Sequence, residues 1–146
     1  MLVRDYMTST VTTIKDDAKL LDAALVIRRS GKRHVPVLSA TTGKVVGIVS
    51  DRDVSRFSPS MLEKHSEDDY NQVFETTPIT KVMTREPLSI SPDAPIADAV
   101  QLLSAKKVGA LLAVEDGHLK GILSVMDLLG LLGELLANSK AAGADA

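Results

Sequence analysis

The strongest constraint in this sequence is an internal repeat. Met7-Thr8 recurs as Met83-Thr84, at an offset of 76 residues, and Gly47 recurs as Gly121, at an offset of 74. The two missing residues lie at a turn just before Gly117, where a pair of strands tolerates a deletion. A chain that repeats itself at this length is expected to fold as two copies of one structural unit.

Each repeat shows the same order of elements: a helical turn, a strand, a helix, a strand, a turn, a strand and a final helix. In the first repeat the strands are expected at 11–14, 34–38 and 44–50, with a helix that begins near Asp16-Asp17 and ends at Gly31. In the second repeat the matching segments are 88–90, 95–106, 110–114 and 119–124. The pattern predicts an α+β fold made of two β-α-β-β-α repeats.

The predicted boundaries follow from this alignment. Residues 1–57 form the first repeat and residues 79–137 the second. Residues 58–78 are polar and acidic, and we expect a linker with a short helix that begins at Ser58-Pro59-Ser60. Residues 138–146 are expected to form a disordered tail.

The same motif closes the third strand of each repeat. The copies are Gly47-Ile48-Val49-Ser50-Asp51-Arg52-Asp53 and Gly121-Ile122-Leu123-Ser124-Val125-Met126-Asp127. A serine at a helix N-cap leaves backbone N–H groups pointing outward, where the helix dipole favours an anion. An aspartate on the first turn can accept hydrogen bonds from a vicinal diol. The motif would therefore suit a ribose-phosphate.

A purely structural interpretation of the motif stays open. Ser-x-x-Asp is close to a capping box, in which the N-cap serine and an acidic residue three positions later satisfy each other's backbone donors. The recurrence of the motif at the same place in a longer repeat shifts the balance toward a site.

Composition limits the classes of protein that remain. The chain has 146 residues, 45% of them hydrophobic, and a formal net charge of −2. It has no cysteine, which excludes disulfides, thiolate metal sites and a cysteine nucleophile. The first residues do not resemble a signal peptide and no long uncharged apolar run is present, so we expect a cytoplasmic protein without a membrane partner.

The order of elements and the duplicated motif together resemble a tandem pair of cystathionine-β-synthase (CBS) domains, also called a Bateman module. His34-Val35-Pro36-Val37 and Gly109-Ala110-Leu111-Leu112 fit the second-strand pattern of that family. The resemblance extends from about Val3 to Leu132, and the first repeat is also similar to acetoin-utilisation-type CBS proteins. It implies two repeats related by a pseudo-two-fold axis.

This resemblance implies a stand-alone regulatory module that binds an adenosine-containing ligand in clefts between the repeats and signals to an unknown target protein. The ligand would be AMP, ADP or ATP, or else S-adenosylmethionine or NAD, and no cofactor is required. The ligand-binding residues that it implies, including flanking positions, are Ser50, Arg52, Asp53, Arg33, His34, Val35 and Thr13 in one site and Ser124, Asp127, Val108, Gly109 and Ala110 in the other.

The two predicted sites differ in charge. Arg52 lies inside the first motif, and Lys32 and Arg33 precede the strand beside it, whereas Met126 occupies the position of Arg52 in the second motif. Charge-assisted hydrogen bonds to phosphate are stronger than neutral ones, so the first site is expected to prefer a polyphosphate. The alternative is that Arg28, Arg29, Lys32 and Arg33 only form a solvated helix end.

Two other functions are not expected from the sequence, and a third stays open. An enzyme is not expected, because no nucleophile and base have a recognisable spacing and the three histidines lack metal-ligand spacing. Nucleic-acid binding is not expected either, because the basic cluster from Arg28 to His34 is short and the chain is acidic overall. The third alternative is a protein-interaction or dimerisation module that binds no ligand.

A leucine-rich run near the C-terminus predicts a homodimer through helices. Leu128, Leu131, Leu132, Leu135 and Leu136 follow helical spacing, and the run extends beyond the point where the matching helix of the first repeat turns polar. A contiguous exposed apolar face usually marks an interface. The alternative is that the segment from Ser55 to Phe74 folds back over these leucines within one chain.

Overall fold

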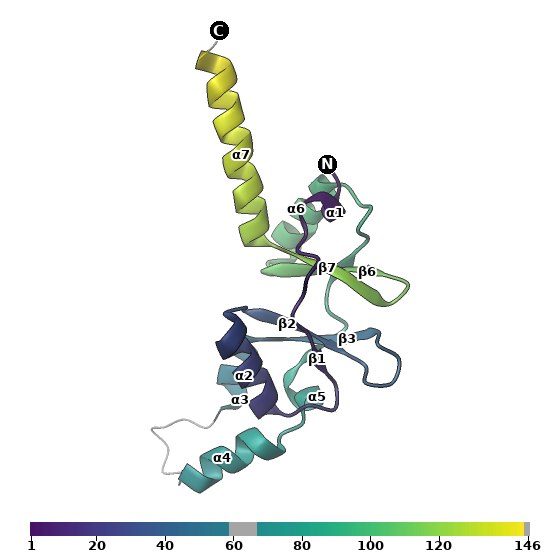
Figure 1. Ribbon diagram of the computed structural model, residues 1–146, viewed down its shortest axis with the longest axis vertical. Coiled ribbons are helices and arrows are strands. Elements are labelled where there is room, and N and C mark those ends of the chain that lie inside the picture. Colours follow the sequence, from purple (N-terminus) through teal and green to yellow (C-terminus); the bar gives the residue numbers. More distant parts are fainter. Residues whose placement is uncertain (59–66, 145–146) are drawn as a thin grey trace. The chain divides into compact units, whose positions relative to one another are not determined.

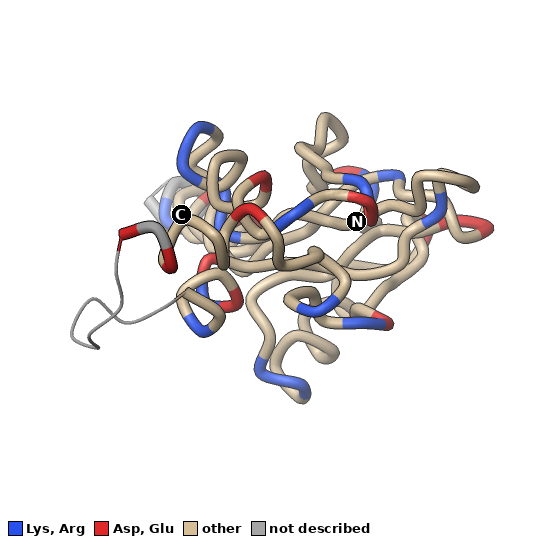
Figure 2. The backbone as a smooth tube through the Cα atoms, turned by 90° about the horizontal axis from the view of Figure 1, so that it is seen from below, with Lys and Arg blue, Asp and Glu red and all other residues tan. Residues whose placement is uncertain are grey.

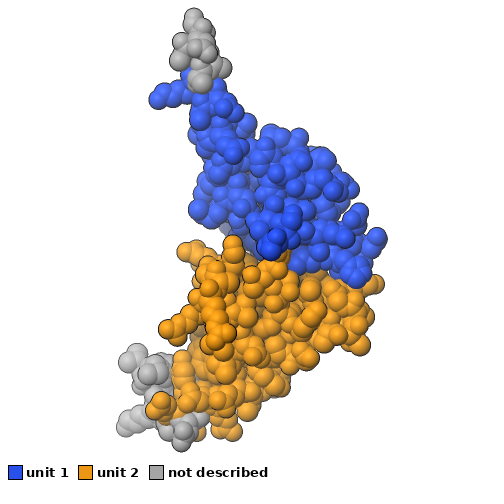
Figure 3. Space-filling view, viewed as in Figure 1, with its two compact units in different colours: residues 1–10, 88–146 blue, residues 11–87 orange. Residues whose placement is uncertain are grey.

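The computed structural model describes residues 1–58 and 67–144, which divide into two compact units (Figure 3). The first-repeat unit is Val11–Pro87. The second-repeat unit combines Met1–Thr10 with Leu88–Ala146. Each unit includes the Met-Thr segment that precedes the other repeat: Met83-Thr84 belongs to the first-repeat unit and Met7-Thr8 to the second-repeat unit. The units therefore differ from the predicted contiguous segments 1–57 and 79–137.

The first-repeat unit contains a four-stranded sheet in the order β1-β2-β3-β4. Its strands are β1 (Ile14–Lys15), β2 (His34–Leu38), β3 (Val45–Ser50) and β4 (Thr84–Arg85). β1 runs parallel to β2, and the other pairs are antiparallel. Helices α2 (Leu20–Ser30), α3 (Asp51–Phe57) and α5 (Ile79–Val82) lie on one face of this sheet, with α4 (Glu67–Thr76) farther out (Figure 1).

The second-repeat unit repeats this plan with a three-stranded sheet in the order β5-β6-β7. The strands are β5 (Ser89–Ile90), β6 (Ala110–Glu115) and β7 (His118–Ser124). The helices are α1 (Val3–Tyr6), α6 (Ile96–Lys106) and α7 (Val125–Ala144). The predicted α+β class and the two β-α-β-β-α repeats are confirmed.

Each unit has its own apolar core. In the first-repeat unit it includes Leu20, Val35, Val49 and Ile79, all fully buried. In the second-repeat unit it includes Val3, Leu111 and Leu123, also fully buried, together with Leu131 of α7. The buried positions in the strands alternate with more exposed ones on β3 and β7, as the half-covered sheets require.

Two glycines allow the Met-Thr segments to lie close to the sheets. A Cβ added to Gly47 would lie 2.6 Å from Met83 Sδ and 2.9 Å from the Thr84 carbonyl oxygen. A Cβ at Gly121 would lie 2.6 Å from Met7 Sδ and 2.9 Å from the Thr8 carbonyl oxygen. No side chain fits at either position, so a glycine within a strand here marks a close backbone approach.

The chain beyond each third strand differs between the repeats. α3 ends after two turns at Ser58, whereas α7 continues to Ala144. The segment 138–144 is thus helical, in contrast to the disordered tail predicted for 138–146. The reason is physical: a helix that is already nucleated extends readily through alanines and other tolerant residues. The start predicted for the linker helix, at Ser58-Pro59-Ser60, falls mainly outside the described residues, and α4 occupies the linker from Glu67.

Candidate functional site

The first candidate site lies where β3 passes into α3. Ser50 is the last residue of β3 and the N-cap of α3. Its Oγ accepts a hydrogen bond from the Asp53 backbone N–H at 3.2 Å, and its backbone N–H donates to Asp53 Oδ2 at 2.9 Å. The Ser50 hydroxyl also lies 3.0 Å from the same carboxylate oxygen, to which it donates. The predicted capping box is therefore formed.

The second candidate site has the same construction between β7 and α7. The Ser124 backbone N–H donates to Asp127 Oδ2 at 2.8 Å, and Ser124 Oγ accepts from the Asp127 backbone N–H at 3.1 Å. Both copies of the motif therefore cap a helix, which is the structural interpretation left open by the sequence.

Capping leaves part of each carboxylate available. Within residues 1–58 and 67–144, both Asp53 and Asp127 use Oδ2 for the cap, and neither uses Oδ1 in a hydrogen bond. Asp53 is held more tightly, because it is only 8% exposed. The cap fixes the side-chain rotamer and leaves the second oxygen as an acceptor, so capping and diol binding are compatible.

The neighbouring strand brings further predicted residues to each motif. In the first-repeat unit His34 is paired with Ser50 in the β2–β3 register, and the Asp51 backbone N–H donates to the Arg33 carbonyl oxygen at 3.0 Å. In the second-repeat unit Ala110 is paired with Ser124. The Val125 backbone N–H donates to the Gly109 carbonyl oxygen, also at 3.0 Å.

For the remaining predicted site residues, the structure gives burial and position in the chain. Val35 is fully buried in the core of its unit and is paired with Val49 in the β2–β3 register. Thr13 precedes β1 and is half-buried, and Val108 precedes β6 and packs partly against the core of the second-repeat unit. Arg52 is exposed on the first turn of α3.

Charges of both signs surround His34. Burial is the main cause that lowers its pKa, and Arg33 and Arg52 lower the pKa further, while Asp51 and Asp53 raise it. The net direction is downward from the ordinary value of 6.5. The charges of Arg33, Arg52 and Asp53 thus all influence the pKa of His34. The sequence analysis missed Asp51, whose position beside the N-cap serine was the available signal.

The lowered pKa of His34 predicts a pH dependence of stability. As the pH falls through 6.5 toward the lower pKa of the folded state, the unfolded chain binds more protons than the folded chain, so the free energy of unfolding decreases. We expect His34→Gln to flatten this loss as the pH falls below 6.5, as measured by urea unfolding at each pH. A variant with the wild-type slope would contradict the assignment.

The basic residues near this site remain solvent-exposed. Arg28 and Arg29 on α2 and Lys32 and Arg33 after it are all exposed. The ion pair found among the described residues joins Arg4 and Asp93, and therefore none of the four takes part in one there. In Figure 2 positive and negative positions are both scattered over the described chain, without the long basic stripe typical of nucleic-acid-binding proteins.

The described part of the chain contains neither a metal-binding cluster nor a membrane-spanning helix. No group of three or more His, Asp or Glu side chains there is arranged to hold a metal ion. No helix there combines the length and the apolar character needed to cross a membrane.

Comparison with protein families gives a match on both repeats. The CBS domain model matches residues 3–60 and 79–134. These segments contain both Ser-x-x-Asp motifs and leave out α4.

Among curated relatives, the CBS domain-containing protein YhcV of Bacillus subtilis is 28% identical over 126 residues, which are 86% of this chain and 81% of YhcV. Homoserine O-acetyltransferase of Methanococcoides burtonii is 30% identical over 132 residues, 90% of this chain and 24% of that enzyme. The chain spans about a quarter of the length of the first relatives that it matches.

Among solved structures, the AcuB protein of Vibrio cholerae has a TM-score of 0.78 and 28% identity, covering 97% of this chain and 96% of its own. CBSX2 in complex with AMP has a TM-score of 0.75 and 23% identity, covering 92% and 97%. A CBS domain pair in complex with 5′-methylthioadenosine and S-adenosyl-L-methionine has a TM-score of 0.74 and 21% identity, covering 92% and 97%.

Proposed function

The chain belongs to the CBS-domain family, and from this premise we propose that it is a regulatory module that binds an adenosine-containing ligand. The observation that carries the proposal is the duplicated arrangement of a strand-end serine, a capped aspartate and a neighbouring strand. The role is regulatory rather than catalytic, and the response to the ligand passes to a protein partner.

Each residue of this arrangement has a chemical role in the proposal. The aspartate carboxylates at positions 53 and 127 accept hydrogen bonds from the ribose hydroxyls through Oδ1, while Oδ2 keeps the cap. The serines hold these carboxylates in place and contact phosphate or ribose. The adenine lies against backbone near Val35 in one site and near Val108, Gly109 and Ala110 in the other, and Thr13 flanks the first site.

Relatives of the same fold support the ligand class. CBSX2 was solved with AMP, and another CBS domain pair was solved with 5′-methylthioadenosine and S-adenosyl-L-methionine. These ligands share an adenosine moiety and differ in the group at its 5′ end. We therefore propose adenosine as the recognised part and AMP, ADP or ATP as the first ligands to test, with S-adenosylmethionine and NAD next.

The two sites are proposed to differ in the charge that they accept. Arg33, His34 and Arg52 lie beside the first motif, whereas Gly109, Ala110 and Met126 take the matching positions of the second. A phosphate that approaches the first site meets two guanidinium groups, and these give stronger hydrogen bonds than neutral donors. ADP and ATP are accordingly assigned to the first site, and a less charged adenosine ligand to the second.

Asp53→Asn tests the ribose contact with little change in shape. The amide oxygen can still cap α3, but the charge that strengthens a diol hydrogen bond is lost. We expect adenine-nucleotide affinity to fall by about tenfold to a hundredfold in isothermal titration calorimetry, as for the loss of a charge-assisted hydrogen bond. Asp127→Asn is the matched variant at the second site, and circular dichroism checks that both variants fold. Unchanged affinity in both folded variants would refute the assignment.

A second measurement separates a ligand sensor from a pure interaction module. The freshly purified protein is denatured, and any released small molecules are identified by mass spectrometry. The sensor proposal predicts a released adenosine compound or saturable binding in a titration with AMP, ADP and ATP. A protein that releases none and binds none of them would be the ligand-free interaction module.

We also propose that the module is a homodimer through its helices. Leu131 holds α7 to its own unit, since it is only 6% exposed, but Leu129, Leu132 and Leu136 are 52%, 49% and 61% exposed. Within the first-repeat unit, α4 packs on α2. A second copy of α7 has the same apolar face and is the partner that fits it.

A further inference from the structure

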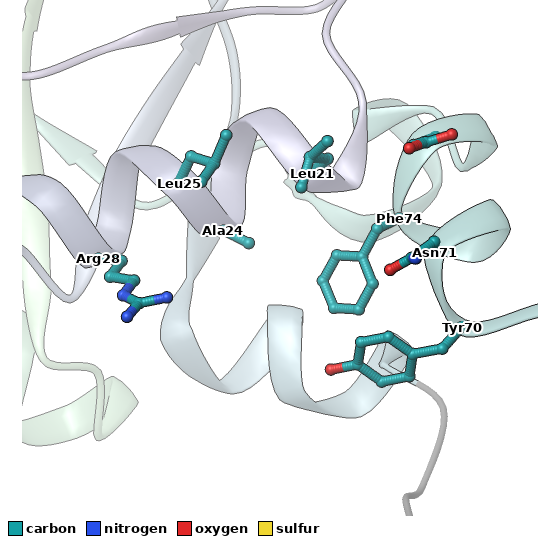
Figure 4. A pocket seen from close by; sticks show the side chains of 8 residues that line it. Leu21, Ala24, Leu25, Arg28, Tyr70, Asn71 and Phe74 are labelled. Carbon is teal, nitrogen blue, oxygen red and sulfur yellow. The ribbon is translucent and has the colours of Figure 1, made fainter. Parts of the chain in front are cut away.

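A groove in the first-repeat unit lies apart from the Ser-Asp motif, between α2 and α4. It encloses a volume of about 200 Å³. Its walls are lined from α2 by Leu21, Ala24, Leu25 and Arg28, and from α4 by Tyr70, Asn71, Phe74 and Glu75 (Figure 4).

The wall made by α4 lies outside the two segments that the CBS domain model matches. The CBS domain model stops at residue 60 and resumes at residue 79, so it leaves out α4. Val73 and Phe74 nevertheless pack against the core of the unit, and the Leu20 backbone N–H donates to the Thr77 carbonyl oxygen at 2.8 Å. The groove therefore has two fixed walls and is no part of the duplicated motif.

The groove is lined mainly by apolar side chains and also contains a few polar groups. Leu21, Ala24 and Leu25 supply aliphatic surface, and the rings of Tyr70 and Phe74 lie 4.9 Å apart at their centroids. Figure 4 shows the Arg28 guanidinium and the Tyr70 hydroxyl pointing into the space between the helices.

Both polar groups are available to a ligand. Within residues 1–58 and 67–144, neither Arg28 nor Tyr70 takes part in an ion pair or a side-chain hydrogen bond. An arginine beside an apolar wall suits a carboxylate, because the planar guanidinium can donate two parallel hydrogen bonds to it. Glu75 also lines the groove and disfavours a second negative charge on the ligand.

We propose that this groove binds a compact monocarboxylate with an apolar tail. The carboxylate is held by Arg28, and the tail lies against Leu21, Leu25 and Phe74. The volume of about 200 Å³ is below the roughly 300–1,000 Å³ typical of pockets for drug-sized ligands. The fitting ligands are thus short-chain aliphatic or single-ring acids.

The test uses hexanoate and phenylacetate as probes and the full chain labelled with ¹⁵N for NMR. Saturable shifts of amides on α2 and α4 are expected with either acid, and much weaker ones with hexan-1-ol, which has the tail without the charge. Arg28→Gln should weaken binding by about tenfold or more, since it removes a charge-assisted contact. Tyr70→Phe should weaken it less, because the ring remains.

Arg29→Gln is the matched control, because Arg29 is the next residue on α2, carries the same charge and does not line the groove. It should leave the affinity for hexanoate unchanged, and AMP should not displace the acid. The proposal is overturned if no saturable shifts occur on α2 and α4, if Arg29→Gln weakens binding as much as Arg28→Gln, or if hexan-1-ol binds as well as hexanoate. These outcomes are independent of whether the Ser-Asp sites bind a nucleotide.

Discussion

Replacing both strand glycines with alanine, in the Gly47→Ala/Gly121→Ala variant, is expected to lower the free energy of unfolding by about 2–6 kcal/mol. Each alanine would place a Cβ 2.9 Å from a backbone carbonyl oxygen and 2.6 Å from a methionine Sδ. The methionine can move, but the carbonyl belongs to a paired segment, so the strand must shift. Overpacking of this kind costs roughly 1–3 kcal/mol per site, and sites in separate units add.

Gly130→Ala and Gly133→Ala are the matched controls, since they are the same chemical change in α7. Apart from the adjacent residues and the backbone of the same helix, no described atom lies within 4 Å of a Cβ built at either position. Because glycine is disfavoured within a helix, these variants should gain roughly 1 kcal/mol each. Urea unfolding followed by far-UV circular dichroism measures the free energy of unfolding of the double variant, of its two single variants and of both controls. Loss of stability at position 130 equal to that at position 47 would show that the change of residue type, rather than the close approach, sets the effect.

The single variants also separate the two units. Gly47→Ala disturbs the pairing of β3 with β4, where Gly47 and Ile48 lie opposite Arg85 and Thr84. Gly121→Ala disturbs the reciprocal backbone hydrogen bonds between Thr8 and Ile122, at 2.9 and 3.0 Å. Hydrogen exchange should therefore report faster opening in the first-repeat unit for one variant and in the second-repeat unit for the other.

The repeat itself was predictable, but the exchange of segments between repeats was not. Hydrophobic periodicity and turn residues indicated the order of strands and helices, which the structure contains. The first strand was expected at 11–14 but is Ile14–Lys15, and the first long helix begins at Leu20 rather than near Asp16-Asp17. The alignment paired Met7 with Met83 and Gly47 with Gly121, yet it gave no sign that Met7 packs on Gly121. A glycine within a strand indicates that another backbone approaches closely. The sequence does not identify the approaching segment, because that is decided by tertiary contacts.

The local structure of the two motifs was predictable, whereas their role as binding sites stays a prediction. The spacing Ser-x-x-Asp indicated both a capping box and a ribose site, and the structure shows the capping box in both units. The pairing of His34 with Ser50 required the β2–β3 register, which a turn of uncertain length leaves open in the sequence. The groove on α2 was not predicted, because an acidic linker gives no hint that Val73 and Phe74 are held against the core.

Leu132→Glu is expected to convert the proposed homodimer into a monomer. Val125, Leu129, Leu132 and Leu136 follow one another at spacings of four, three and four residues, so they form one exposed stripe on α7. Figure 1 shows α7 extending away from the sheet of its own unit, which leaves this stripe without cover from that unit. A glutamate in the middle of the stripe would bury an unpaired charge in the dimer, at a cost of several kcal/mol.

The folded monomer should tolerate the same change, because Leu132 is 49% exposed, whereas Leu131, at 6%, and Leu128 pack α7 against the core. Asn138→Glu is the control: it adds the same charge at an exposed position of α7, away from the stripe. Sedimentation equilibrium at micromolar concentration should find dimers for the wild type and Asn138→Glu and monomers for Leu132→Glu. A wild-type monomer, with and without AMP, would refute the homodimer. Dimers that survive Leu132→Glu would place the interface elsewhere, since burial of an unpaired carboxylate in the stripe is incompatible with tight association.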